Sequence, residues 1–322
     1  MDRIAILTSG GDAPGMNACI RAVTRHGIHR GLEVVGVRHG FDGLIAGEFR
    51  TLGPRDVGNI IQRGGTVLGS SRSKAFHTPE GREQAVGRLQ QAGVDGLVVC
   101  GGNGSFAGAV ALGEHWDGGI AGVPATIDND ISGTDTTIGY DTAINTALEA
   151  IDRIRDTAES QERVFLVEVM GRTCGSIALD VALAGGAVAA LVPESPYDLE
   201  RLVALLKSAR MNGRTSNIII VAEGEEHGGA FRVAEQLQPH VPGPLRVTVL
   251  GHIQRGGAPT AASRILGTRL GVAAVDALIG GASGVMTAVR GSSVMLVPLR
   301  EAIAQQRPPD TGMVDLILGL VG

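Results

Sequence analysis

The sequence predicts an α/β protein whose sheets are doubly wound and mainly parallel. Short β-branched apolar runs recur along the chain, and most of them lack the polar alternation of strands that face water. Amphipathic helical patterns lie between many of these runs. Strands buried on both faces read as near-continuous apolar segments, and strands that alternate with helices pair in parallel through right-handed crossovers.

The expected strands are short, as buried parallel strands usually are. They lie at residues 4–7, 32–37, 94–100, 120–124, 164–169, 189–192, 217–221 and 246–250. Apolar residues at helical spacing predict two helices, one over residues 141–160 and one over residues 199–210.

A chain of 322 residues with 43% apolar residues is long enough for two domains with substantial cores. No clear linker divides it, so the long helix after Gly139 and the Gly-rich segment near Gly251 are the expected crossing points. We therefore expect two Rossmann-like domains with the chain passing between them more than once. The expected domains comprise residues 1–139 with 252–304, and residues 140–251 with 305–322.

Composition and charge exclude several classes of function. The net charge is −5, and no basic cluster suits nucleic acid. Cys19, Cys100 and Cys174 are odd in number and scattered, which predicts reduced packing residues rather than disulfides. No signal peptide is recognised, and the uncharged stretch 96–113 holds six glycines, which favours a strand, loop and helix over a membrane span. A cytoplasmic protein without membrane contact is expected.

Residues 126–130 (Thr-Ile-Asp-Asn-Asp) directly follow one of the expected strands. Open α/β sheets bind ligands at the carboxyl ends of their strands. At such an edge, one of the carboxylates of Asp128 and Asp130 can ligate Mg²⁺ while the other takes a proton from an attacking hydroxyl. Taken alone, the run is more often an acidic loop that caps the next helix, but the rest of the chain favours the functional interpretation.

Two Gly-rich turns each follow a strand and precede a helix: residues 8–12 (Thr-Ser-Gly-Gly-Asp) and 100–105 (Cys-Gly-Gly-Asn-Gly-Ser). Such turns bring backbone N–H groups to a phosphate at a helix N-terminus, although ordinary tight turns look the same. Residues 102–107 also fit the loose dinucleotide fingerprint of a dehydrogenase, which is absent from the first strand. Neither Lys74 nor Lys207 follows a glycine, and this excludes a P-loop.

Arg172, Glu223 and the pair His252 and Arg255 also follow expected strands. Arg172 could hold a phosphate or form a surface salt bridge. Glu223 could accept sugar hydroxyls or cap a helix. A lone His is more often structural, but an Arg three residues away raises the odds that the pair holds a phosphate monoester.

Four motifs together resemble ATP-dependent 6-phosphofructokinase of the bacterial type. They are residues 8–17 (Thr-Ser-Gly-Gly-Asp-Ala-Pro-Gly-Met-Asn), 126–130, 169–172 (Val-Met-Gly-Arg) and 250–257 (Leu-Gly-His-Ile-Gln-Arg-Gly-Gly). Their order and spacing match that family over nearly the whole chain, and separate chance matches at four places are not credible.

This resemblance implies phosphoryl transfer from MgATP to the 1-hydroxyl of fructose 6-phosphate, with Mg²⁺ as the metal ion. It also implies a homotetramer with active sites shared between subunits, a first domain that binds nucleotide and a second that binds sugar phosphate. The implied catalytic residues are Asp128 as base, with Thr126 and Arg172 at the transferring group. The implied ATP contacts are Gly11, Phe41, Arg72, Gly102, Gly104 and Ser105. The implied sugar-phosphate contacts are Thr126, Asp128, Met170, Gly171, Arg172, Glu223, His252 and Arg255, with Arg163 and Arg246 reaching a neighbour's site.

Gly104 and Ala125 indicate the phosphoryl donor. Relatives that use pyrophosphate carry Asp and Lys at these positions, and an Asp at 104 would crowd and repel the α-phosphate of ATP. Both residues are small and neutral here, which favours ATP.

Asp130 and Asn103 would serve Mg²⁺, but Asn103 departs from the family's usual loop, which reads Gly-Gly-Asp-Gly-Ser. An Asn oxygen can ligate a hard cation but brings no negative charge. Losing one preorganised electrostatic contact costs about 3 kcal/mol, roughly a hundredfold in rate, so we expect reduced turnover.

The family's allosteric nucleotide site is eroded. Basic residues remain at matching positions at Arg21, Arg25, Arg155 and Arg214, and Arg55 lies beside Pro54, where an Arg is expected. Val188 replaces an acid that helps to bind the effector's magnesium. Anion binding could survive, but activation by ADP is not expected.

A second hypothesis is a catalytically weak paralogue that binds sugar phosphate and regulates or completes a partner's site. Arg163 and Arg246 would act in a partner's site without needing Asn103. A dehydrogenase ranks third, since it explains neither the acidic run nor the His–Arg pair.

Overall fold

The computed structural model describes residues 1–161, 163–213, 215–224 and 229–321. The chain divides into two compact units, each with its own sheet. The first unit is Met1–Ile127, Ile131–Thr142 and Arg255–Arg307, and the second is Asp128–Asp130, Ala143–Gln254 and Pro308–Gly322. The predicted fold class, with mainly parallel sheets and repeated crossings, is confirmed.

The limits of the units differ from those expected in the sequence. The chain leaves the first unit after Thr142 rather than after residue 139, and returns to it at Arg255 rather than at residue 252. The tripeptide Asp128–Asp130 also groups with the second unit, which no pattern in the sequence indicated.

The first unit contains an eight-stranded sheet. Its strands are β1 (Arg3–Thr8), β2 (Glu33–Val37), β3 (Phe49–Thr51), β4 (Gly96–Gly101), β5 (Gly119–Thr126), β6 (Ile138–Gly139), β11 (Val285–Arg290) and β12 (Ser293–Pro298). They follow the order β12-β11-β5-β4-β1-β2-β3, with β6 paired to β5. Only β3 and β12 run antiparallel to their neighbours.

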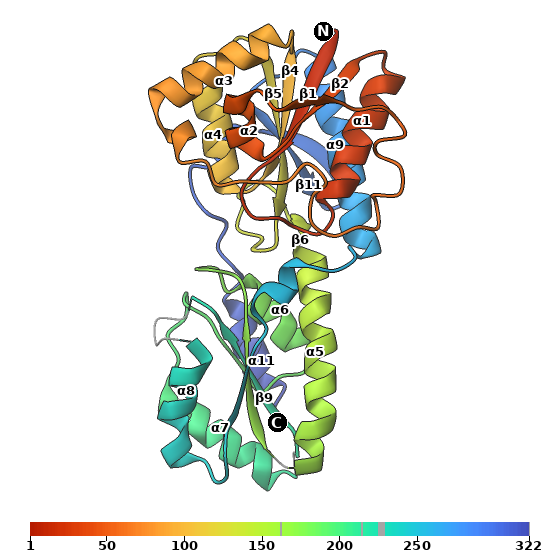
Figure 1. Ribbon diagram of the computed structural model, residues 1–322. Helices are drawn as coiled ribbons and strands as arrows, with labels where there is room; N and C mark the ends of the chain where they lie inside the picture. Colours follow the sequence, from red (N-terminus) through yellow and green to blue (C-terminus); the bar gives the residue numbers. More distant parts are fainter. Residues whose placement is uncertain (162, 214, 225–228, 322) are drawn as a thin grey trace. The chain divides into compact units, whose positions relative to one another are not determined.

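Helices cover both faces of this sheet (Figure 1). They are α1 (Met16–His29), α2 (Gly40–Ala46), α3 (Pro79–Gln91), α4 (Asn103–Gly113), α9 (Ala261–Ile279) and α10 (Leu299–Ala302), with a 3-10 turn η1 (Ala75–His77). The helices α1 and α9 lie on one side and α2, α3 and α4 on the other. Because both faces are covered, every residue of β4 is buried, which explains the unbroken apolar run there.

The second unit contains a smaller sheet of four parallel strands in the order β10-β7-β9-β8. The strands are β7 (Val164–Val169), β8 (Ala189–Leu191), β9 (Asn217–Ala222) and β10 (Arg246–Val249). The helices are α5 (Tyr140–Gln161), α6 (Ser176–Ala184), α7 (Leu199–Met211), α8 (Gly229–Leu237) and α11 (Gly312–Gly319), with 3-10 turns η2 (Gln238–His240) and η3 (Gly251–Arg255). In Figure 1, α7 and α8 lie on one face of the sheet and α5 and α6 on the other.

The described residues contain all eight expected strands, together with four further strands that were not expected. The strands β3 and β6 have three and two residues, too few to show a period. The hairpin of β11 and β12 ends the sheet, and β12 is largely exposed, so its sequence lacks a buried strand's pattern. Among the described helices, none has an apolar stretch that could cross a membrane.

Truncating a central core residue tests this packing. Leu97 of β4 is fully buried, and Leu97→Ala should lower the free energy of unfolding by about 3 kcal/mol because it leaves a cavity. Urea unfolding measures the change. Leu296→Ala on β12, where the side chain is 45% exposed, is the control and should cost less than about 1 kcal/mol. Equal losses from the two variants would contradict the assigned core.

Candidate functional site

Three strand ends of the first unit meet at one edge of its sheet. Thr8 of β1 pairs with Cys100 of β4, and Gly101 of β4 pairs with Pro124 of β5. The N–H of Ser9 donates to the Cys100 carbonyl at 3.0 Å. The two Gly-rich turns and Thr126, which ends β5, therefore lie side by side, as parallel register requires.

Neighbouring side chains lie close to the glycines of these turns. A Cβ on Gly101 would lie 2.5 Å from Ser105 Oγ, and one on Gly11 would lie 2.6 Å from Arg255 Nη1. The same arginine donates to the Asp12 carbonyl at 3.3 Å. The structure thus brings Arg255 onto the first Gly-rich turn, beside Gly11.

The second Gly-rich turn runs into the N-terminus of α4. Gly102 is the N-cap and offers no side-chain cap, and Asn103 is the first helical residue. The first N–H groups of a helix have no partner within the helix and favour an anion. Apart from its chain neighbours and the backbone of its own helix, no described atom lies within 4 Å of a Cβ built on Gly104. A Cβ built on Gly102 would lie 3.7 Å from Thr126 Cβ. The turn therefore offers open space and N–H donors next to Thr126.

Phe41 and Arg72 flank this edge differently. Phe41 is 4% exposed and stacks on Phe76, with ring centroids 4.1 Å apart, so most of its surface belongs to the core. Arg72 is exposed and follows Ser71, whose carbonyl accepts a hydrogen bond from Gly10 N at 3.1 Å. A backbone hydrogen bond thus holds the segment of Arg72 beside the first Gly-rich turn. Phe41 could contact a ligand only through the small exposed part of its ring.

In the second unit, the acidic run is packed against Arg172. Asp128 is 2% exposed and Asp130 is 8% exposed, while Asn129 between them has a left-handed φ of 54°. Arg172 Nε lies 3.4 Å from Asp128 Oδ2. The Asp128 side chain is 3% exposed and that of Arg172 is 51% exposed. A half-exposed guanidinium therefore compensates a carboxylate that has been withdrawn from water.

The turn that carries Arg172 is fixed by Glu223. Glu223 Oε1 accepts hydrogen bonds from the N–H groups of Arg172, at 2.7 Å, and Gly171, at 3.4 Å. Gly171 and Arg172 both have positive φ, 146° and 55°. A Cβ on Gly224 would lie 1.7 Å from the Arg172 carbonyl oxygen. One carboxylate and one glycine thus hold an unusual backbone, a role that neither sequence interpretation of Glu223 included.

Gln254 holds the residue before this turn. It is fully buried, and its Oε1 accepts the Met170 N–H at 2.8 Å while its Nε2 donates to the Ala143 carbonyl at 3.4 Å. The sequence interpretation gave no role to Gln254, although it stands inside the motif 250–257. The only feature of the sequence that could have pointed to Gln254 is an uncharged polar residue inside this motif.

The remaining sugar-phosphate candidates lie at different ends of the second sheet. His252 is exposed on η3, beyond the carboxyl end of β10. Arg163 precedes β7 and Arg246 begins β10, so both lie at the amino edge. Since β7 has six residues at about 3.3 Å each, this edge is roughly 20 Å from Arg172. Arg163 and Arg246 therefore cannot share a small ligand with Arg172 in the same unit.

A profile of the family described as Phosphofructokinase matches residues 3–278. The chain belongs to the phosphofructokinase family. It is 55% identical over 316 residues to ATP-dependent 6-phosphofructokinase 1 of Thermus thermophilus, covering 98% of each chain. It is 49% identical over 323 residues to ATP-dependent 6-phosphofructokinase of Cytophaga hutchinsonii, covering 100% of this chain and 98% of the other. The solved phosphofructokinase of Saccharomyces cerevisiae has 38% identity and a TM-score of 0.91, covering 94% of this chain and 45% of that one.

The effector residues expected from the phosphofructokinase pattern belong to both units. Arg21, Arg25 and Arg55 lie in the first unit, where Arg25 Nη2 donates to the Pro54 carbonyl at 3.1 Å. Arg155 lies in the second unit and donates to Ser216 Oγ at 3.4 Å and to the Gly185 carbonyl. Arg214 lies outside the described residues. Arg155 is thus already bonded to its own unit.

The metal candidates are also divided between the units, Asn103 in the first and Asp130 in the second. Within the described ranges, no group of three or more His, Cys, Asp or Glu could hold a metal by itself. Mg²⁺ in phosphoryl-transfer sites is commonly held by one or two carboxylates together with substrate phosphates and water. Asp130 and Asn103 each offer a hard oxygen donor of the kind that such a set uses.

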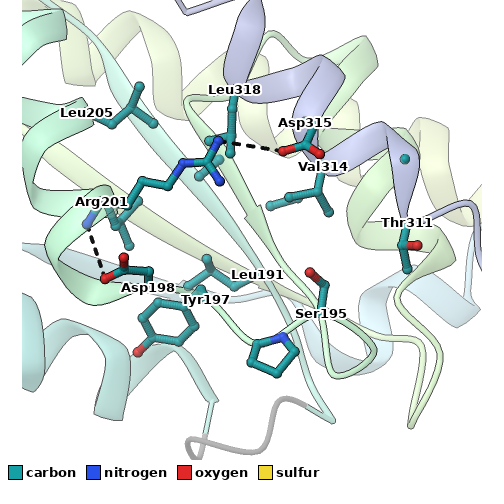
Figure 2. A pocket seen from close by; sticks show the side chains of 15 residues that line it. Leu191, Ser195, Tyr197, Asp198, Arg201, Leu205, Thr311, Val314, Asp315 and Leu318 are labelled. Atoms are coloured by element: carbon teal, nitrogen blue, oxygen red, sulfur yellow. Dashed lines mark hydrogen bonds and ion pairs between the residues drawn. The ribbon is translucent and has the colours of Figure 1, made fainter.

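The second unit also contains a cavity of about 450 Å³ between α7, α11 and the end of β8 (Figure 2). Arg201 reaches across it to Asp315, with Nη2 and Oδ1 3.6 Å apart. Asp198 caps α7 by accepting from the N–H groups of Glu200 and Arg201. None of the predicted site residues lines this cavity.

Removing the Gln254 amide tests the buried support of the turn. Gln254→Leu keeps the volume but leaves the Met170 N–H without an acceptor, so the free energy of unfolding should fall by about 1–3 kcal/mol. Denaturant unfolding provides the measurement. The exposed Gln91→Leu on α3 is the control and should change stability by less than about 0.5 kcal/mol. An unchanged midpoint for Gln254→Leu would show that the bond is not needed.

Proposed function

We propose that this phosphofructokinase transfers a phosphoryl group from MgATP to the 1-hydroxyl of fructose 6-phosphate, giving fructose 1,6-bisphosphate in glycolysis. The observation that carries the proposal is the buried Asp128 carboxylate with the Arg172 guanidinium 3.4 Å away. The chain links this pair to the Gly-rich turns, because Thr126 ends β5 beside Gly102 and Asp128 follows two residues later. Sequence identity of 55% and 49% to two ATP-dependent 6-phosphofructokinases, over 98% and 100% of this chain, supports the same reaction.

In this proposal, Asp128 accepts the proton of the attacking 1-hydroxyl. The carboxylate is nearly enclosed, so its geometry is fixed before the substrate binds. Arg172 compensates the acid's charge and, through its exposed half, stabilises negative charge on the transferring group. Thr126 contacts the same group from the end of β5. Phosphoryl transfer depends mainly on such positioning and charge neutralisation.

The nucleotide contacts are assigned to the first unit. Its two Gly-rich turns would hold the ATP phosphates with backbone N–H groups of Gly11, Gly102, Gly104 and Ser105, and Arg72 would add charge. Open space at Gly104 leaves room for the α-phosphate, and Ala125 is 1% exposed, so neither position offers the acid and lysine of pyrophosphate users. Phe41 would contribute an edge to the adenine pocket. Mg²⁺, held by Asp130 and Asn103, would neutralise phosphate charge when bound.

The sugar-phosphate contacts are assigned chiefly to the second unit. Met170, Gly171, Arg172, Glu223 and His252 would surround the sugar, and Arg255 of the first unit would add a phosphate contact. Glu223 Oε1 is engaged by the turn, so a sugar hydroxyl would bond the same carboxylate without displacing it. Arg163 and Arg246 lie at the opposite edge, which supports their use in a neighbouring subunit's site and hence a homotetramer.

Replacing the proposed base should remove most activity. Asp128→Asn keeps the shape but cannot accept the proton, so kcat should fall about 10²- to 10⁴-fold with a smaller change in KM. A coupled assay of ADP release with fructose 6-phosphate measures both. Asp42→Asn, an exposed acid of α2, is the control and should leave kcat unchanged. Retention of wild-type kcat by Asp128→Asn would exclude it as the base.

Restoring the family's usual acid should raise activity. Asn103→Asp adds a negative charge to the metal ligand set, and kcat should rise by up to about a hundredfold. The acid would stand in the first turn of α4, where the helix dipole favours it, so folding should not suffer. Asn212→Asp, at the exposed end of α7, controls for charge alone. No gain in kcat would remove the argument for reduced turnover.

The alternative function is a weak paralogue that completes a partner's site. The placement of Arg163 and Arg246 at the amino edge favours it, because those residues need no catalysis in their own chain. Turnover of the purified chain, alone and mixed with a catalytic homologue, decides between the two. Robust kcat alone supports the enzyme, whereas activity that appears only in the mixture and is lost in Arg163→Ala and Arg246→Ala supports the paralogue.

A further inference from the structure

A second cavity of about 360 Å³ lies at the amino edge of the second sheet. The first residues of β7 and β9, the last turn of α7 and the segment after η2 enclose it. Its apolar lining includes Val164, Leu206, Val241 and Pro242. This volume falls in the range of pockets that bind small organic molecules.

Basic side chains surround this cavity without acidic neighbours in its lining. Lys207, Arg210 and His240 line it, and all three are exposed. None of them makes a side-chain hydrogen bond or an ion pair with another described residue. The cavity of Figure 2 differs, because there Arg201 lies 3.6 Å from Asp315. The amino-edge cavity therefore has an uncompensated positive charge.

Asn217, the first residue of β9, adds a buried polar group to the same lining. It is 6% exposed, and its Oδ1 has no hydrogen-bond partner among the residues that the structure describes. Buried polar atoms almost always have partners, and leaving one without a partner destabilises the fold. A ligand that donates an O–H or N–H to this amide would remove that penalty.

We propose that this cavity binds a small organic anion: a carboxylate or phosphate monoester on an apolar body that also carries a hydrogen-bond donor. The anionic group lies against Lys207 and Arg210, where charge-assisted hydrogen bonds form. The apolar body packs on the aliphatic lining, and the donor bonds Asn217. Each part of the ligand therefore contacts a different group of the lining.

The site is separate from the proposed active site of its own unit. The strand β9 begins at Asn217 and leads to Glu223, so the two ends are roughly 20 Å apart at about 3.3 Å per residue. One small molecule cannot reach both. The cavity also includes Val164, the neighbour of Arg163, so the ligand contacts the segment that positions that arginine. The binding itself does not depend on the proposed reaction.

Calorimetric titration of the full chain with 4-hydroxyphenylacetate, without ATP or sugar phosphate, tests the proposal. Its methyl ester lacks the charge and should bind at least about tenfold more weakly. Phenylacetate lacks the phenol donor and should bind about five- to tenfold more weakly. 4-Hydroxyphenyl phosphate compares the two anionic groups, and the tighter binder identifies which one the site prefers. Absence of binding by both hydroxylated anions up to about 10 mM would overturn the proposal.

Variants place the binding in this cavity. Lys207→Gln combined with Arg210→Gln should weaken 4-hydroxyphenylacetate about tenfold or more, and both residues are exposed, so folding is retained. Asn217→Leu should abolish the preference for 4-hydroxyphenylacetate over phenylacetate while raising Tm, because it removes a buried group without a partner. Arg201→Gln, on the same helix but in the cavity of Figure 2, is the control and should bind normally. Loss of binding in the control, or full binding in the double variant, would contradict the site.

Discussion

The proposed chemistry depends on one constraint: a buried carboxylate must have a cation held beside it. Asp128 is almost enclosed, and the Arg172 guanidinium lies 3.4 Å from its carboxylate. Arg172 has a left-handed backbone, which is costly for a residue with a side chain. Its position therefore needs independent support, and the structure provides this through Glu223 and Gly224.

The register of the second sheet places Glu223 beside the turn that carries Arg172. The parallel register of β7 and β9 puts Val169 opposite Ala222, so the residues that follow, Met170 and Glu223, leave the sheet together. Glu223 can then accept the N–H groups of the next turn, and Gly224 lets the Arg172 carbonyl approach. Small shifts of register would separate these groups. The fold thus fixes the turn that carries the proposed catalytic Arg172 through hydrogen bonds from its backbone N–H groups to the Glu223 carboxylate.

The sequence could predict what is local and could not predict what depends on distant partners. Apolar runs located eight strands because burial on both faces leaves a pattern within each segment. Motifs located Asp128 and Arg172 because their chemistry is visible in the residue types. The Gln254 amide bonds the backbone of Met170 and Ala143, which lie far away in the chain, and no period or motif contains that pairing. The burial of Phe41 depends in the same way on a distant residue, because its ring stacks on Phe76.

Asn103 has nearly the shape of the usual Asp but lacks its negative charge. Asn and Asp have nearly the same shape, so we expect either residue to fit the first helical position of α4. In the proposed site, the charge beside the metal would differ by one unit, and electrostatic stabilisation of a transferring phosphoryl group depends on that charge. The helix N-terminus favours an anion and gives the fold no reason to exclude an acid. In the proposed mechanism, reduced turnover would therefore arise from the missing charge rather than from a change in the shape of the side chain.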